Sequence, residues 1–264
     1  MLQSISQRHG RSRGGLRGPR RKAAPAAYRA VRSRYDRGSS QRRAVLFPSR
    51  DRTGDTLYST AKLEMEGTFL LGDKDRYQTF AMSARQVLRA PDQFVWMPRM
   101  RSSAMSITGS DALVDGEAWT RFWVLGVVPV AQDHTSPDLV RSAQFRAVVE
   151  GALSLPTSLL PANDVDWEQL NEHRARVTFR RFSPAIILEM ILDSSGAVRE
   201  VVGQRWSNAN RDRTFRLQPF GGTMGADRTF QGLTIPTEIA AGNHYGTADY
   251  LPFFQVRLIN ATYS

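Results

Sequence analysis

The sequence, 264 residues long, predicts an all-β fold: a single eight-stranded jelly roll, in which two antiparallel sheets pack face to face. Two observations favour this fold class. Apolar and polar side chains alternate over several segments that are rich in β-branched and aromatic residues. Strands and helices do not succeed one another regularly, which argues against an α/β fold. We also expect one or two short inserted helices, and a disordered basic arm ahead of the sheets.

The strongest alternation lies between Leu57 and Leu71. Apolar side chains occupy one parity there and polar side chains the other, which predicts a long half-buried strand or a bent strand pair. After it, Asp75 is expected to cap a helix that ends before Pro91. The apolar residues of this helix recur at about 3.6-residue spacing. They are Tyr77, Phe80, Ala81, Ala84, Val87 and Leu88.

Further segments are bounded by Gly, Pro, Asp or Ser and are predicted to be strands. They cover residues 94–97, 104–108, 119–130, 175–179, 186–192, 198–205, 214–220 and 253–262. A hairpin turn is expected at Asp193-Ser194-Ser195-Gly196. A second helix is expected to start at Ser136-Pro137 and to run to about Val149. The Gly- and Thr-rich stretch at 221–246 is expected to be a surface loop.

The basic charge is concentrated at one end of the chain. The formal net charge is +11, yet residues 1–43 contain 13 of the 36 Arg and Lys residues and a single acid, Asp36. The rest of the chain is therefore almost neutral. This division predicts two parts: an arginine-rich disordered arm over 1–43 that binds nucleic acid, and a shell domain over 44–264.

The arm is suited to single-stranded nucleic acid, because guanidinium groups bind phosphate and aromatic rings stack on unpaired bases. Tyr28 and Tyr35 are candidates for base stacking, with a solvated tail tyrosine as the alternative. The predicted phosphate-binding residues are Arg8, Arg11, Arg13, Arg17, Arg20, Arg21, Lys22, Arg29, Arg32, Arg34, Arg37, Arg42 and Arg43. Two clusters among them are also typical of nuclear import signals. These clusters are Arg20-Arg21-Lys22 and Arg42-Arg43.

No group of residues in the sequence predicts catalysis. Cysteine is absent, which excludes thiolate chemistry and disulfides. The acidic residues Asp111, Asp115 and Glu117 miss the spacing of a calcium loop and predict a polar turn before a strand, with calcium at a subunit interface as the alternative. The histidines lack metal-site spacing. They are His9, His134, His173 and His244. We therefore expect no enzyme activity, no cofactor and no metal.

An arginine-rich arm that leads into a β-rich body resembles the capsid proteins of small circular single-stranded DNA viruses, and most of all those of the genomoviruses, which are related to geminiviruses and include fungal viruses. The segments that carry this resemblance are RDRTGDTLY, EAWTRFWVLG, RVTFRR and GAVREVVGQRW, beginning at Arg50, Glu117, Arg176 and Gly196. The resemblance implies a single jelly roll, a DNA genome replicated in the nucleus, and no catalytic residues.

On this interpretation the chain is a capsid protein that assembles an icosahedral shell of about 60 copies or a multiple. Its partners would be other copies of itself, viral single-stranded DNA and host nuclear import receptors, without a membrane. We would expect to find it in the virion, and in the host nucleus during assembly.

Three alternatives remain open at this point. A capsid protein of a small RNA or satellite virus would share the arm and the jelly roll. An organellar ribosomal or other RNA-binding protein would use the arm as a targeting or RNA-binding tail. An enzyme with a basic localisation tail is the third class.

Overall fold

The computed structural model of the protein describes residues 57–264. These residues form one antiparallel sheet of 13 strands, a single long helix and two short 3-10 helices. The all-β prediction is therefore correct, but the eight-stranded jelly roll is wrong, because all strands belong to one continuous sheet. Period-two patterns show that each strand has one covered face, and they do not show whether a second sheet or a helix covers it.

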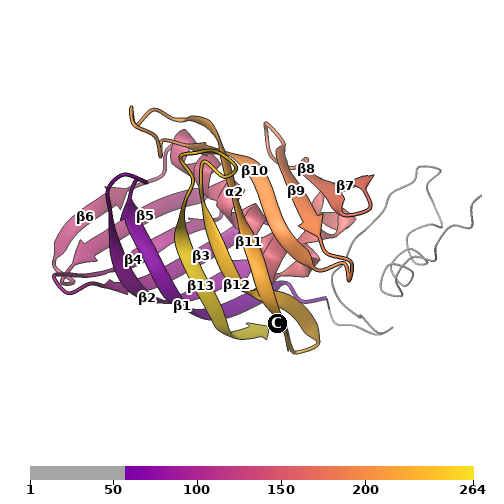
Figure 1. Cartoon of the computed structure of the whole chain (residues 1–264), viewed down its shortest axis with the longest axis horizontal. Helices are drawn as coiled ribbons and strands as arrows, with labels where there is room; N and C mark the ends of the chain where they lie inside the picture. Colours follow the sequence, from indigo (N-terminus) through magenta and orange to yellow (C-terminus); the bar gives the residue numbers. More distant parts are fainter. Residues whose placement is uncertain (1–56) are drawn as a thin grey trace, which may run out of the picture.

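The sheet consists of two meanders. The first contains β1 (Thr60–Gly72), β2 (Tyr77–Arg89), β3 (Gln93–Arg101), β4 (Ser106–Val114), β5 (Glu117–Val124) and β6 (Val128–Asp133). The second contains β7 (Val165–Asn171), β8 (Arg174–Phe179), β9 (Ile186–Leu192), β10 (Val198–Ser207), β11 (Arg216–Phe230), β12 (Leu233–Asn243) and β13 (Leu251–Tyr263). They join where β1 pairs with β13, so that β6 and β7 are the two edges (Figure 1).

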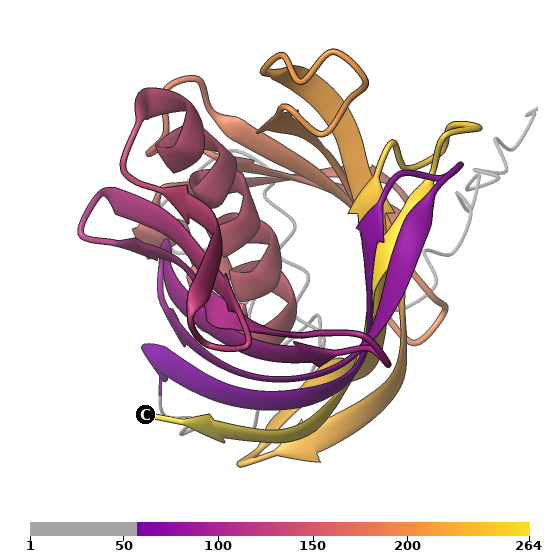
Figure 2. The same cartoon turned by 90° about the vertical axis from the view of Figure 1, so that its left-hand side faces the viewer.

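The helix α2 (Pro137–Ser154) connects the two edge strands and lies on the concave side of the curved sheet (Figure 2). Its predicted start is confirmed, because the Ser136 hydroxyl accepts a hydrogen bond from the Leu139 amide at 3.2 Å. The helix continues past the predicted end at Val149 and is followed by the 3-10 helices η1 (Pro156–Leu159) and η2 (Pro161–Asn163). A central helix therefore takes the place that a second sheet would occupy in a jelly roll.

The predicted helix after Asp75 is in fact strand β2, which pairs with β1 along its whole length. Its buried residues alternate strictly: Phe80, Met82, Ala84, Gln86 and Leu88. Gln86 broke the apolar alternation in the sequence, and so the 3.6-residue spacing of its neighbours was misleading. The Asp73 carboxylate accepts hydrogen bonds from the Asp75 and Arg76 amides and thus caps a hairpin turn rather than a helix.

The predicted loop at 221–246 contains most of β11 and all of β12. Its glycines permit close backbone packing between strands. A Cβ atom added to Gly221 would lie 2.6 Å from the Val201 carbonyl oxygen, and one added to Gly222 would lie 2.4 Å from that of Ala240. These glycines therefore belong to a tightly curved sheet and not to a mobile connection.

Two apolar clusters contact α2. One lies mainly against the first meander and includes Leu63, Phe80 and Trp96. The other lies against β7–β10 and includes Val177, Phe179 and Leu188. The remaining strand predictions coincide with strands of the sheet, although residues 119–130 form a hairpin of β5 and β6, and β7 was not predicted.

Candidate ligand-binding cavity

A cavity of about 570 Å³ lies between α2 and the concave face of the sheet. Its size is within the range of about 300–1,000 Å³ that is typical of small-molecule sites. Aliphatic, aromatic and methionine side chains from both meanders form most of the wall, and α2 contributes Phe145, Val149 and Leu153. The concave side chains of β1 line it because the alternation from Leu63 to Leu71 points every second residue inward.

Two wall residues, Leu71 on β1 and Val130 on β6, are strongly exposed, at 53% and 54%. A side chain that both lines a cavity and contacts solvent marks the place where the cavity opens. The mouth is therefore apolar. The tip of the β5–β6 hairpin next to Val130 adds the exposed side chains of Leu125 and Val127.

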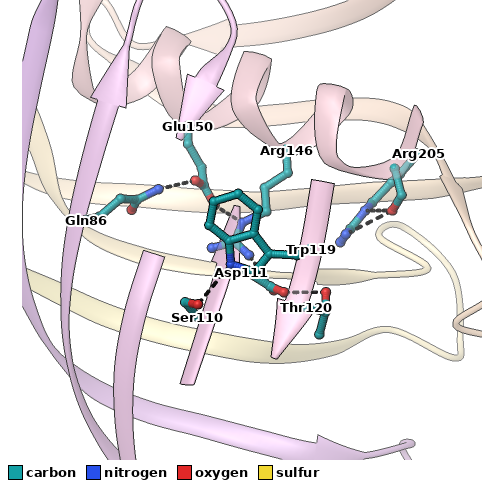
Figure 3. A network of polar contacts seen from close by, with 9 residues as sticks. Gln86, Ser110, Asp111, Trp119, Thr120, Arg146, Glu150 and Arg205 are labelled. Atoms are coloured by element: carbon teal, nitrogen blue, oxygen red, sulfur yellow. Dashed lines mark hydrogen bonds and ion pairs between the residues drawn. The ribbon is translucent and has the colours of Figure 1, made fainter. Parts of the chain in front are cut away.

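One part of the wall is charged, and Arg146 of α2 lies at its centre (Figure 3). Its Nη1 lies 2.9 Å from Asp111 Oδ2 on β4, and its Nε lies 2.6 Å from Glu150 Oε1, one helical turn further along. Gln86 of β2 donates a hydrogen bond to Glu150, and the Thr120 hydroxyl donates one to Asp111. We call Gln86, Asp111, Thr120, Arg146 and Glu150 the Arg146 cluster.

Ion pairing maintains the charge of the cluster. Burial opposes the positive charge of Arg146, but the carboxylates of Glu150 and Asp111 outweigh this effect and raise its pKa. The three charged side chains are only 16–24% exposed, so water screens them weakly. Arg146 also lies over the rings of Phe94 and Trp96, at 4.6 and 4.8 Å. The Arg146 cluster is therefore a well-satisfied polar group in an apolar wall.

Arg205 of β10 is the second arginine in the wall, and its surroundings differ. Its Nε and Nη2 donate to a single acceptor, the Ser142 hydroxyl of α2, at 3.3 and 3.2 Å. Within residues 57–264 no carboxylate lies within ion-pairing distance of it. Burial, and then the charge of Arg146, lowers the pKa of Arg205 to about 10. It therefore remains charged near neutral pH but lacks a direct counterion.

The structure does not test the site residues that the sequence predicted. All thirteen phosphate-binding candidates, the stacking candidates Tyr28 and Tyr35, the import clusters and the arm boundary at residue 43 lie outside residues 57–264. Their role in binding nucleic acid stays a prediction. In the described part of the chain, no group of three or more His, Asp or Glu side chains is arranged to hold a metal ion.

The acidic segment at 111–117 forms the predicted polar turn only in part. Asp115 lies in the predicted turn and Glu117 begins β5, whereas Asp111 lies within β4 and pairs with Arg146. The sequence did contain signals for the cluster: a carboxylate inside a strand, a glutamine in the apolar parity of β2, and Arg146 with Glu150 at i,i+4 on a helix. These signals lie far apart, and only the fold brings them together.

Comparison with known proteins gives one family. The model of a family of unknown function, DUF6544, matches residues 52–256. A LolA superfamily protein from Nitrosomonas europaea is similar in structure, with 10% identity, a TM-score of 0.37, and 91% of this chain and 92% of that chain covered. A putative outer membrane lipoprotein-sorting protein domain from Vibrio parahaemolyticus has 10% identity, a TM-score of 0.34, and coverages of 78% and 85%. No curated protein matches the sequence.

The family match overturns the resemblance to genomovirus capsid proteins. The family whose model matches most of the chain is DUF6544, and not a family of capsid proteins. The capsid function, the closed shell with viral DNA, and the virion and nuclear locations depended on that resemblance and are wrong with it. The RNA-virus and ribosomal alternatives receive no support either.

Residues 57–264 contain no helix of the length and apolarity that a membrane crossing requires.

Proposed function

Since this chain belongs to DUF6544, a family of unknown function, we propose its function from the cavity itself: the protein binds an elongated apolar ligand between α2 and the concave face of the sheet. The observation that carries this proposal is an apolar cavity of about 570 Å³ with an apolar mouth at Leu71 and Val130. Transfer of apolar surface from water into such a cavity is favourable by roughly 25 cal/mol per Å².

We also propose that the protein binds its ligand without converting it. The wall contains no histidine or lysine among the described residues, and the carboxylate next to the Thr120 hydroxyl, that of Asp111, is paired with Arg146. The carboxylates of Asp111 and Glu150 are held by Arg146 and are engaged as a structural group. These features favour a carrier or sensor of apolar molecules over a hydrolase or a transferase.

The test is equilibrium binding of an uncharged probe, radiolabelled hexadecanol, to the full chain. We expect saturable binding of about one molecule per chain. Met65→Trp places a larger side chain in the cavity and should weaken binding by at least about tenfold, as several wall contacts would be displaced. Val256→Phe narrows the same space and serves as a second variant if Met65→Trp does not fold.

Met97→Trp is the matched control, because Met97 is a methionine of β3 that is 42% exposed and does not line the cavity. This variant should bind hexadecanol like the wild type. If the wild-type chain does not bind the probe saturably, or if Met97→Trp weakens binding as much as Met65→Trp does, the cavity is not the ligand site.

A further inference from the structure

We propose that the ligand is an amphiphile with an acidic group, and that Arg205 binds this group inside the cavity. The inference rests on the proposed function, which it extends from apolar binding to a ligand class. Its basis is the contrast between two arginines in one wall, of which one is fully paired with carboxylates and the other is not.

Within residues 57–264, Arg205 has more hydrogen-bond donors than acceptors around it. A guanidinium group has five N–H donors. Within residues 57–264, Nε and Nη2 of Arg205 share one acceptor, the Ser142 hydroxyl, at 3.3 and 3.2 Å. The ring of Phe220, 5.4 Å away, provides a cation–π contact but accepts no conventional hydrogen bond. Several donors of a half-buried cation are thus available to a molecule in the cavity.

The charged groups near Arg205 in the cavity wall do not neutralise it directly. Asp111, Arg146 and Glu150 are the other charged groups of the wall, and both carboxylates are directed to Arg146 (Figure 3). These carboxylates influence Arg205 only from beyond ion-pairing distance, whereas Arg146 repels it. A cation removed from bulk water without a direct partner is unfavourable, and a bound anion relieves this penalty.

The guanidinium group of Arg205 and the wall around it indicate a class of ligand. A guanidinium group forks onto two oxygens of a carboxylate or of a phosphate ester, and arginine is well suited to both. The ring of Phe220 lies 5.4 Å from Arg205 and contacts the ring of Phe145, and most of the rest of the cavity wall is apolar. The site therefore fits a molecule with one anionic group and a hydrocarbon body, such as a fatty acid or an alkyl phosphate.

The experiment compares ligands with the same chain and different ends. Radiolabelled hexadecanoate and hexadecyl phosphate should bind the wild-type chain more tightly than hexadecanol. Arg205→Met should weaken binding of both anions by roughly 10- to 100-fold, the usual range for a lost charge-assisted hydrogen bond, and leave hexadecanol unchanged. Arg205→Lys retains the charge without the fork and should give an intermediate affinity.

Arg141→Met is the matched control. Arg141 belongs to α2, which carries the Ser142 partner of Arg205, but its guanidinium carbon lies 4.0 Å from the centre of the Trp206 ring and it does not line the cavity. This variant should bind all three ligands like the wild type. Inorganic phosphate at millimolar concentration should not displace hexadecanoate, because it lacks the hydrocarbon body.

The possible outcomes separate the two proposals. If all three ligands bind equally well and Arg205→Met changes none of them, the role of Arg205 is refuted while apolar binding stands. If none of them binds, the proposed function itself is refuted. If inorganic phosphate binds at Arg205 and displaces hexadecanoate, the site recognises a free anion and the amphiphile is wrong.

Discussion

The two sides of α2 differ in how the sheet covers them. Towards β7–β10 the helix packs Val148 and Ala152 into a cluster with Leu188, and none of these three side chains lines the cavity. Towards the first meander the same helix presents Arg146 and Glu150 and borders a cavity of about 570 Å³. One helix of about 10 Å diameter does not fill the concave side of a 13-stranded sheet.

The filled side of α2 therefore contributes mainly to stability, whereas the hollow side provides the proposed binding cavity. On the filled side Val148, Ala152 and Leu188 are at most 4% exposed and do not line the cavity, so dispersion and burial both stabilise the fold there. On the hollow side some contacts are missing, and the polar groups there depend on one another. We therefore expect substitutions on the filled side to change mainly the stability of the fold. On the hollow side, the size of the effect should depend on which member of the Arg146 cluster is removed.

The largest effect is expected for Arg146→Met. This substitution leaves the carboxylates of Asp111 and Glu150 without their cation in a wall that is poorly screened by water. Removing one partner of a buried ion pair typically costs about 3–5 kcal/mol of unfolding free energy. Urea unfolding of the purified chain, with two-state behaviour verified, measures this loss.

The control for this prediction removes all three charges. Asp111→Asn and Glu150→Gln combined with Arg146→Met should recover most of the lost stability, because no unpaired charge is left. If the triple variant is as unstable as Arg146→Met alone, then packing of the arginine over Phe94 and Trp96, rather than charge, explains the effect.

A smaller difference in unfolding free energy is expected when the same substitution, Leu to Ala, is made on each of the two sides. Leu188 is fully buried on the filled side, and Leu63 is 2% exposed but lines the cavity. Leu188→Ala should lose about 4 kcal/mol of unfolding free energy, and Leu63→Ala only about 2 kcal/mol, since fewer neighbours contact the deleted atoms. Equal losses in urea unfolding would contradict the distinction between filled and hollow sides.

The smallest effect is expected outside both sides, at the β9–β10 turn. The Ser195 hydroxyl, the amides of Ala197 and Ser195, and Arg199 all bond to the Asp193 carboxylate and lower its pKa to about 2. A lowered pKa stabilises the fold above the unfolded-state value of about 4, and this contribution disappears as the pH falls towards 2.

Asp193→Asn should therefore cost about 1 kcal/mol or less at pH 7, because the carboxylate is one-third exposed. The difference from the wild type should vanish near pH 2. Thermal unfolding at both pH values measures it. A difference that persists at pH 2 would mean that the hydrogen bonds of the turn matter and the charge does not.

The sequence predicted individual elements better than their arrangement. Alternation identified β1, and the Ser136-Pro137 cap identified α2, because both patterns are local. The helix predicted after Asp75 failed at Gln86, whose amide is buried because it bonds to Glu150 of α2. The glycines of β11 suggested a loop, although Gly221 and Gly222 allow neighbouring strands to approach closely. Both errors depend on contacts with distant residues.

The site was not predictable for the same reason. Its charged members come from β4, α2 and β10, and nothing in the local pattern brings Asp111 next to Arg146 or leaves Arg205 without a carboxylate. The concentration of basic charge in residues 1–43 predicts binding of nucleic acid and carries no information about the cavity in the folded part. Resemblance of short segments then supplied a family that the match to DUF6544 excludes.

The β1–β13 ladder also has a consequence for how the chain folds. All neighbouring strand pairs of the sheet except β1–β13 are consecutive in the sequence, so both meanders can grow from local hairpins. Joining them brings together Ser59 and Ser264, which are 205 positions apart. Closing a loop of that length costs about 5 kcal/mol of chain entropy before any contact compensates for it. Formation of the β1–β13 ladder should therefore limit the folding rate of the chain.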